Sequence, residues 1–380
     1  MDSISLPKVI SNLKATYRKG EFWRCEYPVT NQYAAAFHTL TNVGVLANGT
    51  NADIVTTNTG SIFVPKNPES FTYDLDGNLT SDGHWTNSWD GENRLIQMET
   101  ISSVPIQAKQ KLVFSYDHQS RRIRKVVYNW NTNTSQYYVG LDLKFLYDAW
   151  NLIAELNGTN NNLICSYMWG SDLSGSMRGA GGVGGLVCIN HSQLGAQFPA
   201  YDGNGNVMGL VDAVQGTNSA AREFGVFGQE LRGGERIANA SPFRFSSKYQ
   251  DTETSLSYYG YRYLDSAQGR WYNRDRIAEQ GGGNLYGFSQ NGAVNRIDPD
   301  GRRWFETRSC NQKEWTRCNQ GCKKDFGWWS VVDWCWAVKG LELRGSCLRA
   351  DLWIVVYACT STAPDPGDPG DPGTGTGLIE

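Results

Sequence analysis

Short apolar runs alternate with polar, turn-forming residues along most of the chain. In the first 70 residues, the runs at 33–37, 43–46 and 62–64 are separated by stretches rich in Asn, Thr and Gly. Apolar runs of this length between turn formers are typical of β-strands. The pattern therefore predicts that residues 1–70 form an irregular β-rich region.

From residue 71 onward, a pair consisting of an aromatic residue and an aspartate recurs before a turn and a strand. The pairs are Tyr73-Asp74, Trp89-Asp90, Tyr116-Asp117, Tyr147-Asp148 and Tyr201-Asp202. An aromatic side chain suits the buried face of a strand, and an aspartate carboxylate can accept hydrogen bonds from the backbone amides of the turn that follows. Each unit is therefore predicted to be a β-hairpin. Because a lone hairpin cannot bury its apolar face, we expect the hairpins to stack into a ribbon over residues 71–248.

The composition points to the same all-β class. The 380 residues include 42 Gly, 19 Tyr and 14 Trp, which favours strands and turns over helices. The net charge of −3 provides no basic field, so we expect no nucleic-acid binding by the main domain. No apolar run approaches the roughly 18 residues of a transmembrane helix, and the first residues lack the pattern of a signal peptide.

Cysteines are concentrated near the end of the chain. Six of the nine fall within about fifty residues, namely Cys310, Cys318, Cys322, Cys335, Cys347 and Cys359. An even number in a short segment suggests disulfides and an oxidising destination, so we expect a secreted or cell-surface protein. Residues 304–362 are predicted to form a Cys-rich module, and the Pro/Gly-rich residues 363–380 an unpacked linker.

A glycine-rich stretch near the middle of the chain has the spacing of a dinucleotide-binding loop. Gly179, Gly181 and Gly184 satisfy that spacing, but the residues that follow, 186–189, form a β-like run. A pyrophosphate would then have no helix N-terminus on which to sit. We interpret the stretch as glycine turns. The histidines and the Asp-rich turns also lack ligand spacing, so neither a metal nor a cofactor is expected.

Residues 249–303 form the most specific stretch of the sequence. They contain a run of motifs that is similar to the RHS repeat-associated core domain of the RHS/YD-repeat family, and with the aromatic-Asp pairs the resemblance covers residues 70–303. The matching positions are Asp251, Glu253, Thr254, Leu256, Tyr258, Tyr259, Gly260, Arg262, Tyr263, Asp265, Gly269, Arg270, Trp271, Asp275, Asn284, Leu285, Tyr286, Asp298, Pro299 and Gly301.

The resemblance implies a fold and an activity. It implies a β-ribbon that winds into a hollow shell, closed by residues 249–303. In the family this core can act as an aspartyl autoprotease that cuts just after D-P-x-G-L. Such chemistry requires one ionised and one protonated carboxyl group. Asp275 matches a family aspartate, Asp251 or alternatively Glu253 is expected to be its partner, and Arg262 to orient the pair.

Two positions depart from the family pattern near the implied cleavage site. Arg276 replaces the proline that usually follows Asp275, and Arg302 replaces the leucine that usually follows Gly301. An arginine buried there without a partner would cost several kcal/mol and oppose cleavage. The cleavage-adjacent residues are Asp298, Pro299, Gly301 and Arg302. In the competing interpretation, Asp251 and Asp275 are turn and ion-pair residues with Arg262 as their partner.

These expectations lead to two functional hypotheses. In the first, the chain is the C-terminal part of an RHS-type shell. It encapsulates, presents or releases its own C-terminal tail as cargo, in toxin delivery or interbacterial competition, and its enzymatic activity is at most intramolecular aspartyl autoproteolysis. The sequence identifies no immunity protein. In the alternative, the chain is a cell-surface adhesion or carbohydrate-binding YD-repeat protein that contacts a target-cell surface or a glycan without proteolysis.

Overall fold

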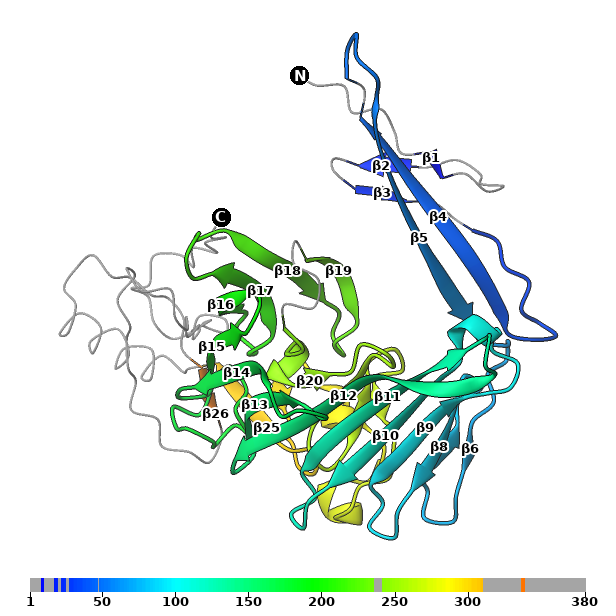
Figure 1. Ribbon diagram of the computed structural model, residues 1–380. Coiled ribbons are helices and arrows are strands. Elements are labelled where there is room, and N and C mark those ends of the chain that lie inside the picture. The colour runs from blue at the N-terminus through cyan, green and yellow to red at the C-terminus, as the bar shows by residue number, and fades with distance from the viewer. Residues whose placement is uncertain are drawn as a thin grey trace, which may run out of the picture.

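The computed structural model describes residues 8–9, 17–19, 22–24, 27–46, 48–235, 241–309 and 336–338, and these residues form strands, turns and short 3-10 helices. The all-β prediction is confirmed. The largest unit is a 14-stranded sheet, called here the ribbon sheet, in which strands follow one another in chain order from β6 to β19 (Figure 1). Its strands are β6 (Thr72–Tyr73), β7 (Leu79–Ser81), β8 (Trp85–Trp89), β9 (Leu95–Thr100), β10 (Gln110–Tyr116), β11 (Arg122–Asn131), β12 (Gln136–Asp148), β13 (Asn151–Asn157), β14 (Leu163–Trp169), β15 (Leu186–His191), β16 (Gly195–Tyr201), β17 (Val207–Asp212), β18 (Asn218–Phe224) and β19 (Glu230–Glu235).

The remaining strands form smaller sheets. In the amino-terminal part these are β1 (Lys8–Val9), β2 (Tyr17–Lys19), β3 (Phe22–Arg24), β4 (Ala36–Leu46) and β5 (Ile54–Val64). After the ribbon sheet come β20 (Tyr249–Gln250), β21 (Leu256–Tyr258), β22 (Tyr263–Asp265), β23 (Arg270–Trp271), β24 (Arg296–Ile297), β25 (Phe305–Ser309) and β26 (Trp336–Val338). The 3-10 helices are η1 (Ile106–Ala108), η2 (Phe245–Ser247), η3 (Ala278–Gly281) and η4 (Phe288–Asn291).

A ladder of aromatic side chains joins successive hairpins of the ribbon sheet. The aromatic residue at the end of the first strand of one hairpin donates a hydrogen bond to a backbone carbonyl in the second strand of the preceding hairpin. The pairs are Trp89 to Leu79 (2.8 Å), Tyr116 to Leu95 (2.7 Å), Tyr147 to Arg122 (3.0 Å), Trp169 to Leu152 (2.7 Å) and Tyr201 to Leu186 (2.5 Å). Trp169 was not among the predicted aromatic-Asp pairs because Gly170 follows it.

Aspartates organise several of the turns between these strands. The Asp117 carboxylate accepts the backbone N–H groups of Gln119 and Arg121, both at 2.9 Å. Asp74, Asp90 and Asp202 accept backbone N–H groups of their own turns in the same way. Asp148 differs, because its carboxylate pairs with Arg178 at 2.5 Å.

The segment that follows the ribbon sheet packs against one of its faces. We call residues 249–303 the core segment. A single buried cluster contains Phe114, Phe145 and Leu152 from the ribbon sheet together with Tyr258 and Tyr263 from the core segment. Figure 1 shows the ribbon sheet curving around the strands of the core segment. Apolar burial between the two therefore fixes where the core segment lies.

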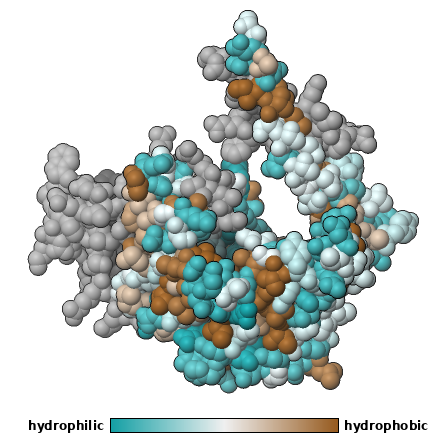
Figure 2. Space-filling view, viewed as in Figure 1, coloured by the Kyte–Doolittle hydropathy of each residue, from teal (hydrophilic) through white to brown (hydrophobic). Residues whose placement is uncertain are grey.

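The β4–β5 hairpin extends away from this body, as Figures 1 and 2 show. Most of β5 is exposed along its length. Cys165 and Cys188 lie in the ribbon sheet as buried free thiols, whereas the six cysteines predicted to form disulfides fall outside the described residues, as does the linker 363–380. In the part of the chain that the structure describes, no helix is long and apolar enough to cross a membrane.

Candidate functional site

Arg262 brings two carboxylates of the core segment together. It lies in the turn between β21 and β22, and its side chain is only 4% exposed. One terminal nitrogen is 2.9 Å from Asp275 Oδ2, and the other is 3.5 Å from Asp298 Oδ2. The guanidinium lies 4.2 Å from the centroid of the Trp271 ring, which fixes its plane. The two aspartates therefore share one buried cation.

Asp298 also holds the backbone that follows it. Its Oδ1 atom accepts the N–H group of Gly301 at 2.8 Å and that of Arg302 at 3.2 Å. Arg262 Nε donates to the Gly301 carbonyl. Gly301 has a φ of +82°, a conformation that favours glycine. The Asp-Pro-Asp-Gly turn is thus wrapped around the same arginine that binds the two carboxylates.

Asp275 lies close to the carbonyl group of Arg302. A Cβ atom added to Gly281 would be 2.3 Å from Asp275 Oδ2 and 3.0 Å from the Arg302 carbonyl oxygen. Both oxygens therefore border the same small space, which glycine leaves unfilled. Asp275 itself is held by the Ile277 N–H group at 3.0 Å. This places a carboxylate beside the Arg302–Arg303 peptide bond.

The environment favours protonation of both carboxyl groups. Burial raises the pKa of Asp298 to about 6, with Arg262 opposing the rise and Asp300 adding to it. Burial also raises the pKa of Asp275, again against the effect of Arg262. Two carboxyl groups that share one arginine in a buried site can hold one proton between them at mildly acidic pH.

Asp251, the expected partner of Asp275, lies at a different arginine. Its carboxylate forms a bidentate pair with Arg122, at 2.5 and 3.1 Å, and also accepts a hydrogen bond from Lys125 at 3.0 Å. Burial alone would raise the pKa of Asp251, but Arg122 and Lys125 outweigh burial and lower it. The alternative partner, Glu253, is paired with Lys125 at 3.0 Å. The structure therefore brings Asp298 to Arg262 and Asp275, and places Asp251 and Glu253 elsewhere.

Arg302 has partners in the structure. Its guanidinium binds the Asp300 carboxylate at 2.9 and 2.6 Å and lies 4.2 Å from the centroid of the Tyr261 ring. Its side chain is 41% exposed. It lines an open hollow together with Glu92, His118, Gln119, Ser120, Tyr261, Arg276 and Ile277. The expected cost of an unpaired, buried guanidinium does not arise here.

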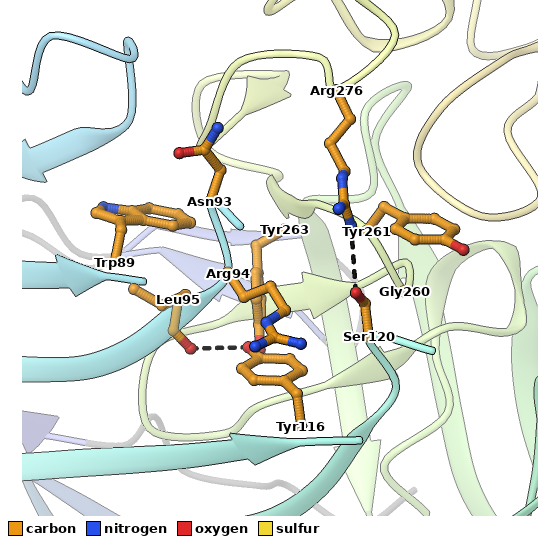
Figure 3. Close-up of a pocket in the computed structure, with 10 residues that line it drawn as sticks. All are labelled: Trp89, Asn93, Arg94, Leu95, Tyr116, Ser120, Gly260, Tyr261, Tyr263 and Arg276. Carbon is orange, nitrogen blue, oxygen red and sulfur yellow. Dashed lines mark hydrogen bonds between the residues drawn. The ribbon is translucent and has the colours of Figure 1, made fainter. Parts of the chain in front are cut away.

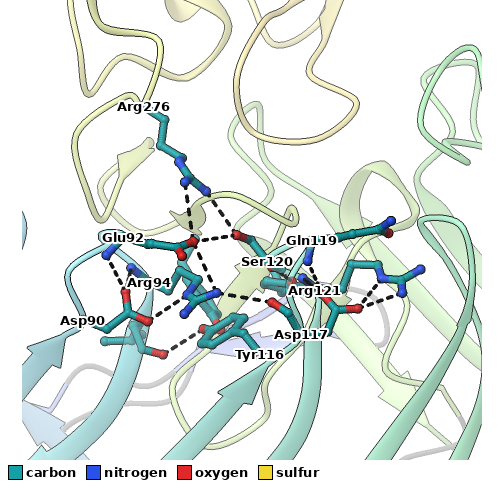
Figure 4. A network of polar contacts seen from close by, with 12 residues as sticks. Asp90, Glu92, Arg94, Tyr116, Asp117, Gln119, Ser120, Arg121 and Arg276 are labelled. Atoms are coloured by element: carbon teal, nitrogen blue, oxygen red, sulfur yellow. Dashed lines mark hydrogen bonds and ion pairs between the residues drawn. The ribbon is translucent and has the colours of Figure 1, made fainter.

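Arg276, the second departure, reaches the turns of the ribbon sheet. One of its nitrogens is 3.2 Å from Ser120 Oγ, and another is 3.8 Å from Glu92. Figure 3 shows Arg276 and Tyr261 at a small pocket beside Ser120. Figure 4 shows how the same arginine joins the turns that begin at Asp90 and Asp117. Arg276 thus ties the core segment to the ribbon sheet next to Asp275.

Comparisons with known proteins give a partial match. No family model matches the chain. The chain is 27% identical over 242 residues to the tRNA3(Ser)-specific nuclease WapA of Bacillus spizizenii, a match that covers 62% of this chain and 9% of that protein. It is 26% identical over 250 residues to the double-stranded DNA deaminase toxin A of Burkholderia cenocepacia, covering 61% of this chain and 17% of the toxin. In the crystal structure of TcdB2-TccC3-TEV, one chain aligns with 69% of this chain and 13% of its own length, at 17% identity and a TM-score of 0.46.

The chain spans less than a fifth of the length of these two relatives. The sequence similarity to part of a nuclease and part of a deaminase toxin supports a toxin-like protein in general terms.

Proposed function

We propose that this chain is the C-terminal part of an RHS-type shell protein that cuts itself after Arg302 and thereby separates a C-terminal cargo from the shell. The observation that carries the proposal is the position of Arg262, which holds Asp275 and Asp298 while Asp298 binds the backbone of Gly301 and Arg302. A carboxyl pair and the peptide to be cut are thus held in one place. We therefore propose Asp298, in place of Asp251 or Glu253, as the partner of Asp275.

The chemistry of the cut is hydrolysis by water. Ionised Asp275 removes a proton from a water molecule, whose oxygen bonds to the carbonyl carbon of Arg302. Protonated Asp298 donates its proton to the carbonyl oxygen, which gives a gem-diol. As the C–N bond breaks, Asp275 returns its proton to the nitrogen of Arg303, and Asp298 takes a proton back from the gem-diol. The products are a carboxyl terminus at Arg302 and an amino terminus at Arg303.

The side chain of Arg302, the residue before the proposed cut, has its own binding partners. Asp300 neutralises Arg302, and Tyr261 offers its ring face to the guanidinium. We expect this pair to replace the apolar contact that a leucine would make in related proteins. The presence of arginine is then compatible with cleavage.

The released segment would be the residues after Arg302. They include the whole predicted Cys-rich module 304–362, which lies largely outside the described residues. The relatives include a nuclease and a deaminase toxin, which is consistent with a shell that delivers a variable cargo. We propose a secreted or cell-surface setting for this delivery, with the tail as the partner of the shell.

The alternative is an adhesion or carbohydrate-binding protein without proteolysis. Such a protein would present an outward aromatic surface to its ligand. In the described part of the ribbon sheet, however, Tyr73 and Tyr138 are the only exposed Tyr or Trp side chains, at 41% and 51%. In the core segment most large aromatics are buried, including Tyr258, Tyr263 and Trp271. This burial favours the shell proposal.

Mass spectrometry of the intact chain tests the proposal. We expect the 380-residue chain to give one piece of 302 residues and one of 78 residues. A chain that stays at full length during prolonged incubation would overturn the proposal. A piece of 298 residues would instead indicate acid cleavage of the Asp298–Pro299 bond and would also count against it.

A further inference from the structure

Lys248 is a buried lysine that binds the backbone next to Asp298. It directly precedes β20 and is 8% exposed. Its Nζ atom donates hydrogen bonds to the carbonyl oxygens of Pro299, at 2.6 Å, and Gly181, at 2.9 Å. No carboxylate of the described residues forms an ion pair with it. The Nζ atom also lies 5.4 Å from the centroid of the Tyr259 ring. Burying an ammonium group without an ion-paired carboxylate is costly, so we expect a lysine at this position to have a role.

The glycine-rich loop packs against the residues on either side of Asp298. Gly181 has a φ of +65°, and a Cβ atom there would lie 2.4 Å from the Pro299 carbonyl oxygen. The residue before Asp298, Ile297, is fully buried in a small apolar cluster with three residues of the loop region, Leu173, Ala180 and Val183. The loop is therefore shaped to receive the chain around Asp298. Lys248 is the charged group that links the two.

The charges around Lys248 connect it to the carboxyl pair. Burial lowers the pKa of Lys248 to about 8, and the carboxylates of Asp300, Asp298 and Asp172 partly offset this effect. The charged groups that act on Asp298 in turn are Arg262, Asp300, Lys248 and Arg302. A charged Lys248 therefore favours the ionised form of Asp298.

We propose that Lys248 is a positioning residue for self-cleavage, because its ammonium group fixes the Pro299 carbonyl and thereby holds the Asp298 carboxyl beside Asp275 and Arg262. This inference rests on the proposed function. Lys248 acts through the backbone of Pro299 and does not touch the bond that is cut.

The test is the pH profile of cleavage in the full chain. The chain is synthesised in vitro during a short pulse and then moved to buffers between about pH 5 and pH 9, and the 302-residue piece is followed over time. In Lys248→Met, which keeps the length of the side chain without its charge, we expect cleavage to be roughly 10- to 100-fold slower. We also expect the pH at which cleavage declines to rise by about half a unit or more, because Asp298 then loses a nearby cation. In Lys248→Arg, the charge is kept and the decline is expected to stay near its original pH.

The outcomes separate this inference from the proposed function. If the unmodified chain is never cut, the proposed function fails and the role of Lys248 fails with it. If the unmodified chain is cut and Lys248→Met is cut at the same rate with the same pH profile, only the role of Lys248 is overturned. A slower Lys248→Met with an unmoved profile would show a purely structural lysine and would also overturn it. If Lys248→Met does not fold, a Lys248→Arg profile displaced by half a unit or more overturns the proposal, and an unmoved one supports it.

Discussion

Two buried arginines, Arg122 and Arg262, bind carboxylates of the same core segment, yet their surroundings differ. Arg122 lies in β11 of the ribbon sheet, forms a bidentate pair with Asp251 and has a second cation, Lys125, beside it. Aromatic rings surround the Arg122 guanidinium at 4.7 to 5.8 Å, namely those of Phe114, Phe145, Tyr249, Tyr258 and Tyr263. Arg262 instead shares its charge between two carboxylates and a backbone carbonyl.

The difference appears in the direction of the pKa shifts. The pKa of Asp251 is lowered because two cations outweigh burial. The pKa values of Asp275 and Asp298 are raised because burial outweighs the nearby cations, among which Arg262 has the largest effect. A carboxylate with an excess of cations holds a fold together, whereas two carboxyl groups with too little positive charge can exchange protons. The Arg122 cluster is thus suited to docking the core segment, and the Arg262 cluster to chemistry.

The largest expected effect comes from removing one carboxyl of the Arg262 pair. We expect Asp298→Asn to slow cleavage by about 1,000-fold or more, because an amide cannot donate the proton that the carbonyl oxygen needs. The measurement is the fraction of 302-residue piece over time, with Asp275→Asn expected to behave alike. Asp202→Asn is the matched control, since Asp202 holds an equivalent turn in the ribbon sheet. Normal cleavage in Asp298→Asn would remove this residue from the chemistry.

A large effect on stability is expected at the other arginine. Arg122→Met leaves Asp251 buried with a single cation, and we expect the free energy of unfolding to fall by about 3–5 kcal/mol. Urea denaturation followed by tryptophan fluorescence measures this loss. The control is Arg124→Met in the same strand, because the Arg124 side chain is 44% exposed where it pairs with Asp142. That loss should be about 1 kcal/mol or less, and equal losses in both variants would show that the buried Arg122–Asp251 pair has no special part in docking the core segment.

The pH dependence of cleavage follows from the Asp298 pKa. Asp298 must carry a proton to act as the acid, and its pKa is raised to about 6. The rate should therefore fall by about tenfold per pH unit above that value, or about 100-fold by pH 8. Rates from the pulse experiment at a series of pH values test this decline. A rate that rises through the same range would show that the carboxyl pair does not work in the proposed way.

A smaller effect is expected at the contact between Asp300 and Arg302. Asp300→Asn removes the charge that neutralises the Arg302 guanidinium. We expect cleavage to slow by about tenfold, because one exposed charge-assisted contact is lost. The double variant Asp300→Asn with Arg302→Leu restores an uncharged pair and should recover part of the rate. If both variants are cut as fast as the unmodified chain, the contact between Asp300 and Arg302 has no influence on cleavage.

The hairpins could be predicted from local sequence patterns because the contacts that form each turn lie within a few residues along the chain. The carboxylates of Asp90 and Asp117 bond to amides two and four residues ahead, so an aromatic-Asp pair predicts the turn by itself. The family resemblance likewise marked Arg262 and Asp275 as candidates. Trp169 escaped notice because its hydrogen bond to Leu152 does not depend on the residue that follows it.

The choice of partner carboxylate could not be made from the sequence. Asp251 and Asp298 both lie in the core segment, and what separates them is the cation that each one meets. Arg122 is 129 residues from Asp251 along the chain, so no local pattern connects the two. Lys248 was missed for the same reason, because its partners Gly181 and Pro299 are 67 and 51 residues away.

The most direct test of the central claim is to incubate freshly synthesised chain in water enriched in heavy oxygen, at about pH 5.5, where one carboxyl of the pair holds a proton. We expect a 302-residue piece whose new carboxyl terminus carries one heavy oxygen atom, and no such piece from Asp298→Asn. A chain that remains at full length, or a 302-residue piece that Asp298→Asn releases just as fast, would contradict the central claim.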